Sequence, residues 1–322
     1  MSDRIESPRR RLLPGFVNRR NSLRGLGVLL LLALFYYPAG MALVHEVDDD
    51  VAFEAGPEDV VEGGSHAVAI ATALIDREVN QYRWVANDPW FLPAAALDNM
   101  PNYQQGIVGA LARFAFEMTD RIGRTRGSSQ TDPGLQEASG QLQYAGNVWI
   151  FDFSTSLAPT TPSESRYRKA RRSLIAYNRR VAAGSGVFER RADNLQATLD
   201  RFALDLGASS ATLDRHILEG FGGPFDTVAD DLFFGVKGQT YAYYLLLREL
   251  GKDYANVIAE RELATAWAQL LDSMRHAAEL SPLVVVNGDP DSTLLPSHLA
   301  SQGFYLLRAR TQLREVTNIL QK

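Results

Sequence analysis

A run of twenty residues without a formal charge, GLGVLLLLALFYYPAGMALV, lies between Arg24 and His45. At 1.5 Å of rise per residue, a helix of this length spans about 30 Å, which matches the hydrocarbon core of a bilayer. The run therefore predicts a transmembrane helix over residues 25–44. It also divides the chain into two parts that we expect on opposite sides of a membrane.

The two flanks of this run carry opposite charges. Residues 1–25 contain seven arginines against Asp3 and Glu6, a net +5, whereas the total charge of the chain is -5 and the remainder therefore carries -10. Cytoplasmic flanks of membrane helices are enriched in arginine and lysine. We expect residues 1–24 to be a cytoplasmic basic tail and the chain beyond His45 to be extracytoplasmic.

A cleaved signal peptide is an alternative interpretation of the same segment. Residues 26–37 suit the apolar region of a signal peptide, and Gly40 and Ala42 place small residues at the cleavage-site positions. The string NRRNSLR, residues 18–24, also resembles a twin-arginine export signal. We favour a retained anchor because the run is long enough to span a bilayer and the basic flank is long for a signal peptide.

Residues 45–64 form an acidic connection after the apolar run. Positions 46–62, EVDDDVAFEAGPEDVVE, hold eight acids and no base, with glycine and proline breaks. Segments of this composition bury too little apolar surface to fold alone. We therefore expect a solvated tether, with a folded extracytoplasmic domain over residues 65–322.

Helical periodicity dominates residues 65–322. The clearest stripe steps by three and four through Phe188, Ala192, Leu195, Leu199, Phe202 and Leu206, and Leu306, Ala309, Leu313, Val316 and Leu320 repeat it. The dense apolar run at 240–250 indicates a buried helix. Ser65 is a candidate N-cap, and Gly184 and Gly186 can end a helix.

Only two short segments have the composition of strands. They are VWIFDFS at 148–154 and LVVVNGD at 283–289, which we interpret as loops, with a small β-ribbon between them as the alternative. We therefore predict a mainly α protein: a multi-helix bundle of about seven or eight helices with little or no β structure, plus one N-terminal transmembrane helix. A subdivision of the bundle near 184–186 is possible.

The chain contains no cysteine, which excludes disulfides, thiolate metal sites and cysteine nucleophiles. None of the five histidines lies in an HExxH motif or beside a GxSxG motif. We find no recognisable catalytic motif and expect no cofactor. An exported domain also disfavours nucleic acid as a partner.

Two His-x-x-Glu pairs, His216 with Glu219 and His276 with Glu279, are weak metal-site candidates. The spacing puts both groups on one face of a helix. Bundles that hold two metal ions use the reverse order, Glu-x-x-His, together with further glutamates. Solvated or locally paired side chains are the simpler interpretation.

Residues 82–93, YRWVANDPWFLP, gather Trp84, Asp88 and Trp90 in a proline-bounded segment. Aromatic side chains beside a carboxylate are typical of sugar-binding or peptide-binding sites. The structural alternative is a loop held on the bundle by its aromatic residues. Further along, Asp230 and Asp231 with Lys237 could form an acid pair tuned by a cation, or Asp230 and Asp231 could simply begin a helix.

Residues 166–191 hold nine arginines or lysines and one acid, Glu189. The basic string RYRKARR contributes Arg168, Lys169, Arg171 and Arg172, which are candidates for binding an anionic envelope component, a partner protein or the acidic residues 46–62. A solvated helix face is the alternative.

Three strings resemble an uncharacterised proteobacterial family, the domain of unknown function DUF2333. They are FERRADNLQATLDRFALDLGASSATLD at 188–214, ADDLFFGVKGQTYAY at 229–243 and QGFYLLRARTQLRE at 302–315. The resemblance implies a single-pass protein of the Gram-negative inner membrane with its bulk in the periplasm. It implies no catalytic residue. In the last string, Arg308, Arg310 and Arg314 are available to acidic partners.

We therefore expect a non-enzymatic envelope scaffold, interaction or regulatory protein. The alternative is an enzyme or metal-dependent binding protein that acts on cell-wall or lipid material. The sequence indicates neither the partner nor the oligomeric state.

Overall fold

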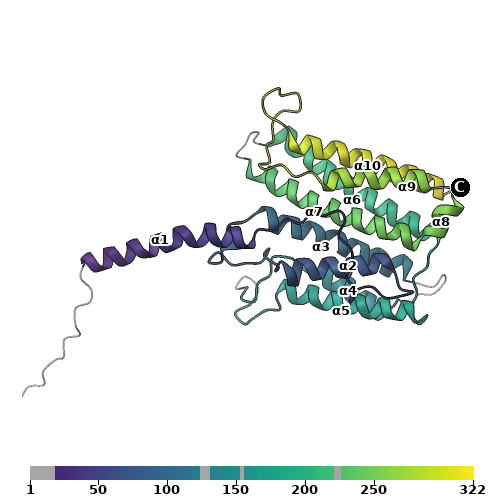
Figure 1. Cartoon of the computed structure of the whole chain (residues 1–322), viewed down its shortest axis with the longest axis horizontal. Helices are drawn as coiled ribbons and strands as arrows, with labels where there is room; N and C mark the ends of the chain where they lie inside the picture. Colours follow the sequence, from purple (N-terminus) through teal and green to yellow (C-terminus); the bar gives the residue numbers. More distant parts are fainter. Residues whose placement is uncertain (1–18, 124–130, 153–155, 221–225) are drawn as a thin grey trace, which may run out of the picture.

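The computed structural model describes residues 19–123, 131–152, 156–220 and 226–322, and all structural statements concern these residues. They are mainly helical, and a long helix, α1 (Arg19–Val44), projects from a bundle (Figure 1). The bundle contains α2 (His66–Asp76), α3 (Asn99–Glu117), α4 (Pro133–Leu142), α5 (Ser163–Ala182), α6 (Ala192–Glu219), α7 (Thr227–Asp253), α8 (Ala255–Glu260), α9 (Ala264–Ala278) and α10 (His298–Leu320). The predicted fold class is confirmed, and the short helices α4 and α8 raise the count above seven or eight.

Helix α1 has the length and the apolar composition needed to cross a membrane over Arg20–Val44. None of the apolar window in this helix is buried in the protein. Most of the arginine-rich flank that was used to predict its orientation, residues 1–18, lies outside the described residues.

Helices α3 and α7 lie at the middle of the bundle. Figure 1 shows α2, α4 and α5 on one side of this pair and α6, α9 and α10 on the other. Glycines allow the two central helices to approach closely, since a Cβ atom at Gly106 would collide with the carbonyl oxygen of Gly235, and one at Gly238 with that of Tyr103. Helix α7 is apolar around most of its circumference, and its segment 240–247 is entirely buried, as predicted for this run.

The predicted apolar stripes form the core. Leu195, Leu199, Phe202 and Leu206 of α6 are buried, and so are the five stripe residues of α10. Gly184, with a φ of 72°, ends α5, as its sequence indicates. The buried side chains before and after this turn belong to one continuous hydrophobic cluster, so the turn does not separate two cores.

The two segments with strand-like composition form no ribbon within the described residues. Residues 148–152 are irregular, and residues 153–154 of that segment lie outside the described residues. Asn287 makes an isolated antiparallel bridge with Ser297 in its own loop. The loop interpretation therefore holds for the described parts of both segments.

The prediction of a solvated tether is wrong for residues 46–62, which we call the acidic segment. This segment connects α1 to α2 in the sequence and lies along the surface of the bundle (Figure 1). Val47, Val51 and Phe53 pack against the hydrophobic core, and the side chain of Asp59 is buried. The prediction used the average composition of the segment, which is acidic. It did not take into account that apolar residues alternate with acids and that these acids have partners on the bundle.

Candidate functional site

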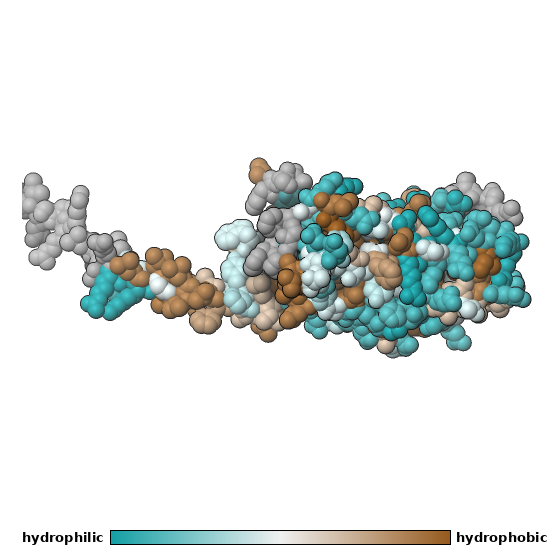
Figure 2. Space-filling model, turned by 90° about the horizontal axis from the view of Figure 1, so that it is seen from above, coloured by the Kyte–Doolittle hydropathy of each residue, from teal (hydrophilic) through white to brown (hydrophobic). Residues whose placement is uncertain are grey.

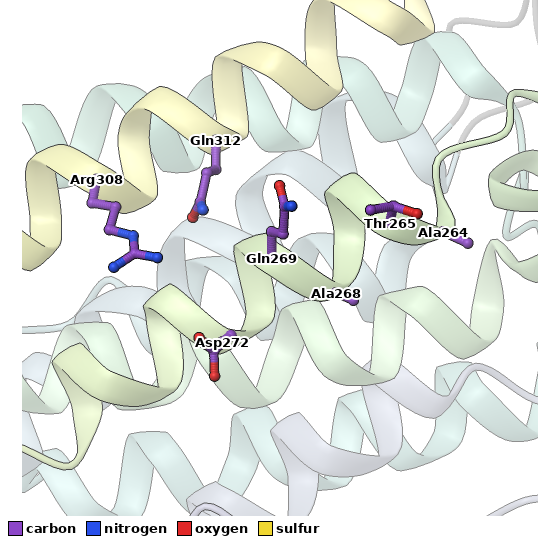
Figure 3. Close-up of a pocket in the computed structure, with 7 residues that line it drawn as sticks. All are labelled: Ala264, Thr265, Ala268, Gln269, Asp272, Arg308 and Gln312. Atoms are coloured by element: carbon purple, nitrogen blue, oxygen red, sulfur yellow. The ribbon is translucent and has the colours of Figure 1, made fainter.

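An open groove lies between α9 and α10 (Figure 3). It has a volume of about 740 Å³ and is lined by Ala264, Thr265, Ala268, Gln269, Asp272, Arg308 and Gln312. Ala264 and Ala268 lie one turn apart on the same face of α9, and their small side chains make room for the groove. Arg308 was among the candidate residues named from the sequence, but the groove was not predicted, because it forms only when α9 and α10 pack side by side.

The groove is lined by polar groups, two of which have no hydrogen-bond or ion-pair partner among the described residues. The Oε1 atom of Gln312 is buried and accepts no hydrogen bond from the described residues. Arg308 is exposed and forms no ion pair there, whereas Asp272 pairs with Arg275 at 3.0 Å. Unpaired buried acceptors are uncommon in folded proteins, so Gln312 is a candidate contact for a donor from outside the chain.

The two histidines of the His-x-x-Glu pairs have separate local partners. His216 Nε2 lies 2.8 Å from Asp226 Oδ2, and His276 Nδ1 lies 2.7 Å from the carbonyl oxygen of Asp272. Glu279 pairs with Arg275 at 3.2 Å. Within the described parts of the chain, no three histidine or carboxylate side chains are grouped as they would be to hold a metal ion.

The aromatic candidates of residues 82–93 point in different directions. Trp84 is buried, its Nε1 donates to the carbonyl oxygen of Gly146 at 2.8 Å, and its ring packs edge-on against Tyr167. Asp88 forms an ion pair with Arg83, and partial burial raises the pKa of this carboxyl. Trp90 is exposed near the end of α1. The structure therefore separates Trp84 from Trp90.

Lys237 is not beside Asp230 and Asp231, so the suggested acid pair has no cation from this lysine. Its Nζ donates instead to Asp49 Oδ2 at 2.6 Å and to the carbonyl oxygens of Ala278 and Leu280 at 3.1 and 2.5 Å. Burial lowers the pKa of Lys237, and the contact with Asp49 opposes this effect. This lysine therefore fixes the acidic segment to α7.

Asp230 and Asp231 lie in the first turns of α7. Partial burial, followed by repulsion from Asp98 and Asp231, raises the pKa of Asp230 to about 6. Asp231 Oδ1 accepts a hydrogen bond from Asn102 at 2.7 Å. Like charges held this closely make the ionised state costly.

A buried arginine holds the acidic segment at a second point. The guanidinium of Arg77 contacts Glu78 at 2.8 Å and Asp48 at 3.3 Å, and its Nη1 donates to the hydroxyl of Tyr241. It also lies over the ring of Phe53, 4.7 Å from the centroid. Burial raises the pKa of Glu78, while the charge of Arg77 acts in the opposite direction. The acidic segment thus covers a charged group that the bundle could not leave unpaired.

The basic residues of α5 mostly bind acids or amides within the chain. Arg168 donates to Asn80 at 2.8 Å, Lys169 pairs with Glu137 at 2.7 Å, and Arg171 pairs with Asp59 at 2.9 Å. Arg172 is exposed, and no hydrogen bond or ion pair is found for it among the described residues. Among the described residues, the ion pair of Arg171 with Asp59 joins the acidic segment to this face.

A family model described as an uncharacterized protein conserved in bacteria, DUF2333, matches residues 38–219. The match covers more than half of the chain, from the last turns of α1 to the end of α6. The α9–α10 groove lies beyond it, as do two of the strings that carried the resemblance. No curated protein and no solved structure matches the chain.

Proposed function

The chain belongs to the DUF2333 family of uncharacterized bacterial proteins, and from that premise we propose that it is a single-pass inner-membrane protein whose periplasmic bundle binds another envelope protein. In this proposal α1 is the anchor, with the N-terminus in the cytoplasm. The bundle acts as a scaffold or regulator and not as an enzyme.

The observation that carries the binding role is the α9–α10 groove with the unpaired Gln312 Oε1. A small molecule in so open a site would leave much of its surface in water, whereas enclosed pockets bury most of a ligand. An extended protein segment can follow the groove between the two helices and donate a backbone N–H to Gln312. Arg308, at the edge of the groove, can pair with an acidic side chain of that segment.

The contacts of the acidic segment support the scaffold role. Asp48 and Asp49 are bound to buried cations of the bundle, and Arg248 donates to the carbonyl oxygens of Val51 and Phe53 at 2.8 and 2.6 Å. A bundle held in this way keeps one orientation relative to α1. A fixed orientation would present the groove at a constant angle to the membrane.

Photo-crosslinking in living cells tests the binding role. A photoreactive amino acid at Thr265 or Gln269 should give a light-dependent adduct with a discrete protein, because both positions line the groove. The same residue at Gly140, on the exposed side of α4, is the matched control. Arg308→Glu should weaken the adduct. Equal adducts from the groove and from Gly140, or no adduct from the groove, would contradict the proposal.

A further inference from the structure

Large apolar side chains remain exposed at the end of the bundle that α1 joins. They lie in residues 89–92, in residues 149–151 with Leu157, and in residues 283–295, which we together call the apolar rim. Trp90 is 81% exposed, Leu157 91%, Leu283 100% and Leu294 89%. Isolated exposed apolar residues are ordinary, but a gathered set marks a surface that contacts lipid or protein.

Helix α1 contacts this rim directly. The hydroxyl of Tyr37 donates to the carbonyl oxygen of Trp90 at 2.6 Å, and that of Tyr36 to the carbonyl oxygen of Phe91 at 3.2 Å. Gly40 lies against Pro93, where a larger side chain would collide. Figure 2 shows the brown apolar surface of α1 running up to the bundle, and further brown patches on the end that it meets.

The position of these contacts along α1 fixes the depth of the rim. Tyr36 precedes Val44 by eight residues, which is about 12 Å along a helix axis. If residues 25–44 span the hydrocarbon core, the loop that holds Trp90 and Phe91 lies below the outer end of the span. Amphipathic segments that bind a membrane surface bury their apolar face about 5–10 Å into the same boundary.

Four aromatic rings at this level form a chain of edge-on contacts, and two tyrosine rings of α1 form a separate edge-on pair. The Tyr36 and Tyr37 centroids lie 5.4 Å apart, and Trp90 packs on Phe91 at 5.8 Å. Phe91 packs on Trp149 at 5.7 Å, and Trp149 on Phe151 at 5.4 Å. Tryptophan and tyrosine concentrate at membrane interfaces because one end of the ring is apolar and the other forms hydrogen bonds.

The charges near the rim argue against an electrostatic contact. Arg83 is already paired with Asp88, and Asp289 and Asp291 are exposed acids in the third segment of the rim. Anionic headgroups would repel these two acids. A contact made here must therefore depend on burial of apolar and aromatic side chains, and should tolerate salt.

We propose that the apolar rim is a second membrane contact, which seats the end of the bundle in the outer interface of the bilayer that α1 crosses. The inference rests on the proposed function in one respect, namely that α1 spans a bilayer. It adds that the bundle touches the lipid itself. The occupant of the rim is the bilayer interface, and a membrane-embedded protein in its place is an outcome of the test.

The absence of cysteine allows one environment-sensitive fluorophore to be attached at a time. The full chain, reconstituted in vesicles of zwitterionic lipid with brominated acyl chains and high salt, would carry Trp90→Cys or Leu283→Cys at the rim. Leu30→Cys in α1 reports insertion of the anchor. Ser185→Cys, exposed between α5 and α6 at the opposite end of the bundle, is the control.

We expect a blue shift and loss of most of the emission at positions 30, 90 and 283, and neither effect at 185. A quenched label at 30 with unquenched labels at 90 and 283 would overturn the membrane contact and leave the proposed anchor intact. If the labels at 90 and 283 were shielded in native membranes but not in the vesicles, the occupant of the rim would be a protein, and the membrane contact would also be overturned. An unquenched label at 30 would overturn both the anchor and the rim contact.

A variant tests the rim without replacing it by labels. Trp90→Asp combined with Leu283→Asp changes two exposed side chains, so the unfolding midpoint should stay the same. A fluorophore at Leu157→Cys should then lose its quenching, because charged side chains oppose entry into the interface. Undiminished quenching at 157 would contradict a shared membrane contact.

Discussion

The Nζ atom of Lys237 lies 2.6 Å from Oδ2 of Asp49, and this ion pair joins the central helix α7 to the segment that follows α1. The lysine side chain is fully buried, whereas that of Asp49 is 31% exposed. The lysine therefore depends on the pair more than the aspartate does, since water can reach only one of the two charges. The pair couples the fold of the bundle to the position of α1.

Removal of this lysine should destabilise the whole chain. Lys237→Met leaves Asp49 and the carbonyl oxygens of Ala278 and Leu280 without their donor, at a cost of about 3 kcal/mol in the free energy of unfolding. Lys252→Met, at a half-exposed lysine of the same helix, should cost at most about 0.5 kcal/mol. Urea unfolding of the detergent-solubilised protein, followed by circular dichroism, measures both. Equal losses would contradict the buried role of Lys237.

The start of α2 depends on a carboxylate from the end of α7. Asp253 accepts hydrogen bonds from Ser65 Oγ at 2.7 Å and from the backbone N–H groups of His66 and Ala67 at 2.9 and 3.0 Å. Asp253→Ala should cost about 2 kcal/mol and Ser65→Ala about 1 kcal/mol. Because the two side chains form one cap, the double variant should lose less than the sum of the single losses in the same unfolding assay. Strict additivity would indicate independent roles.

The contribution of Asp230 to the stability of the protein should fall as pH rises through the titration of this carboxyl. Its pKa is raised to about 6 from 3.8, so the folded state binds this proton more tightly than the unfolded state does. The resulting stabilisation is complete below the unfolded pKa and is lost as pH rises through the folded pKa. Asp230→Asn should reduce the change of the thermal unfolding midpoint with pH between about pH 4 and 6. An unchanged profile in thermal unfolding would show that other groups titrate there.

Two neighbouring arginines of α5 should behave differently. Arg171→Ala leaves the buried carboxylate of Asp59 without its cation, and burial already raises the pKa of this acid, so we expect a loss of about 2 kcal/mol at neutral pH. Arg172→Ala changes an exposed side chain and should stay within about 0.5 kcal/mol. Thermal unfolding of both variants decides this. A larger loss at Arg172 would mean that the basic face has partners other than those described.

The helices could be predicted from the sequence because the apolar residues that they bury recur at helical spacing. The stripes of α6 and α10 bury their apolar residues at the predicted three- and four-residue spacings, since one face of each helix meets the bundle. Ser65 and Gly184 set helix ends through local geometry, which the sequence also encodes.

The acidic segment was mispredicted because its partners are distant in the sequence. The contact of Asp49 with Lys237 has no local signature, whereas the contact of Asp59 with Arg171 is one of the alternatives expected for the basic residues of α5. The α9–α10 groove was missed for a similar reason, since Gln269 and Gln312 meet only when the two helices pack. Trp84 and Trp90 look alike in the sequence, but Trp84 is buried and donates to the carbonyl oxygen of Gly146, whereas Trp90 is exposed.

The orientation of α1 underlies the anchor, the groove and the rim, and cysteine labelling tests it most directly. In cells with a permeabilised outer membrane, a membrane-impermeant maleimide should label Ser185→Cys in full-length protein and should not label Ser2→Cys until the inner membrane is lysed. Labelling of Ser2→Cys in intact inner membranes, or protection of Ser185→Cys, would contradict a periplasmic bundle on a retained anchor.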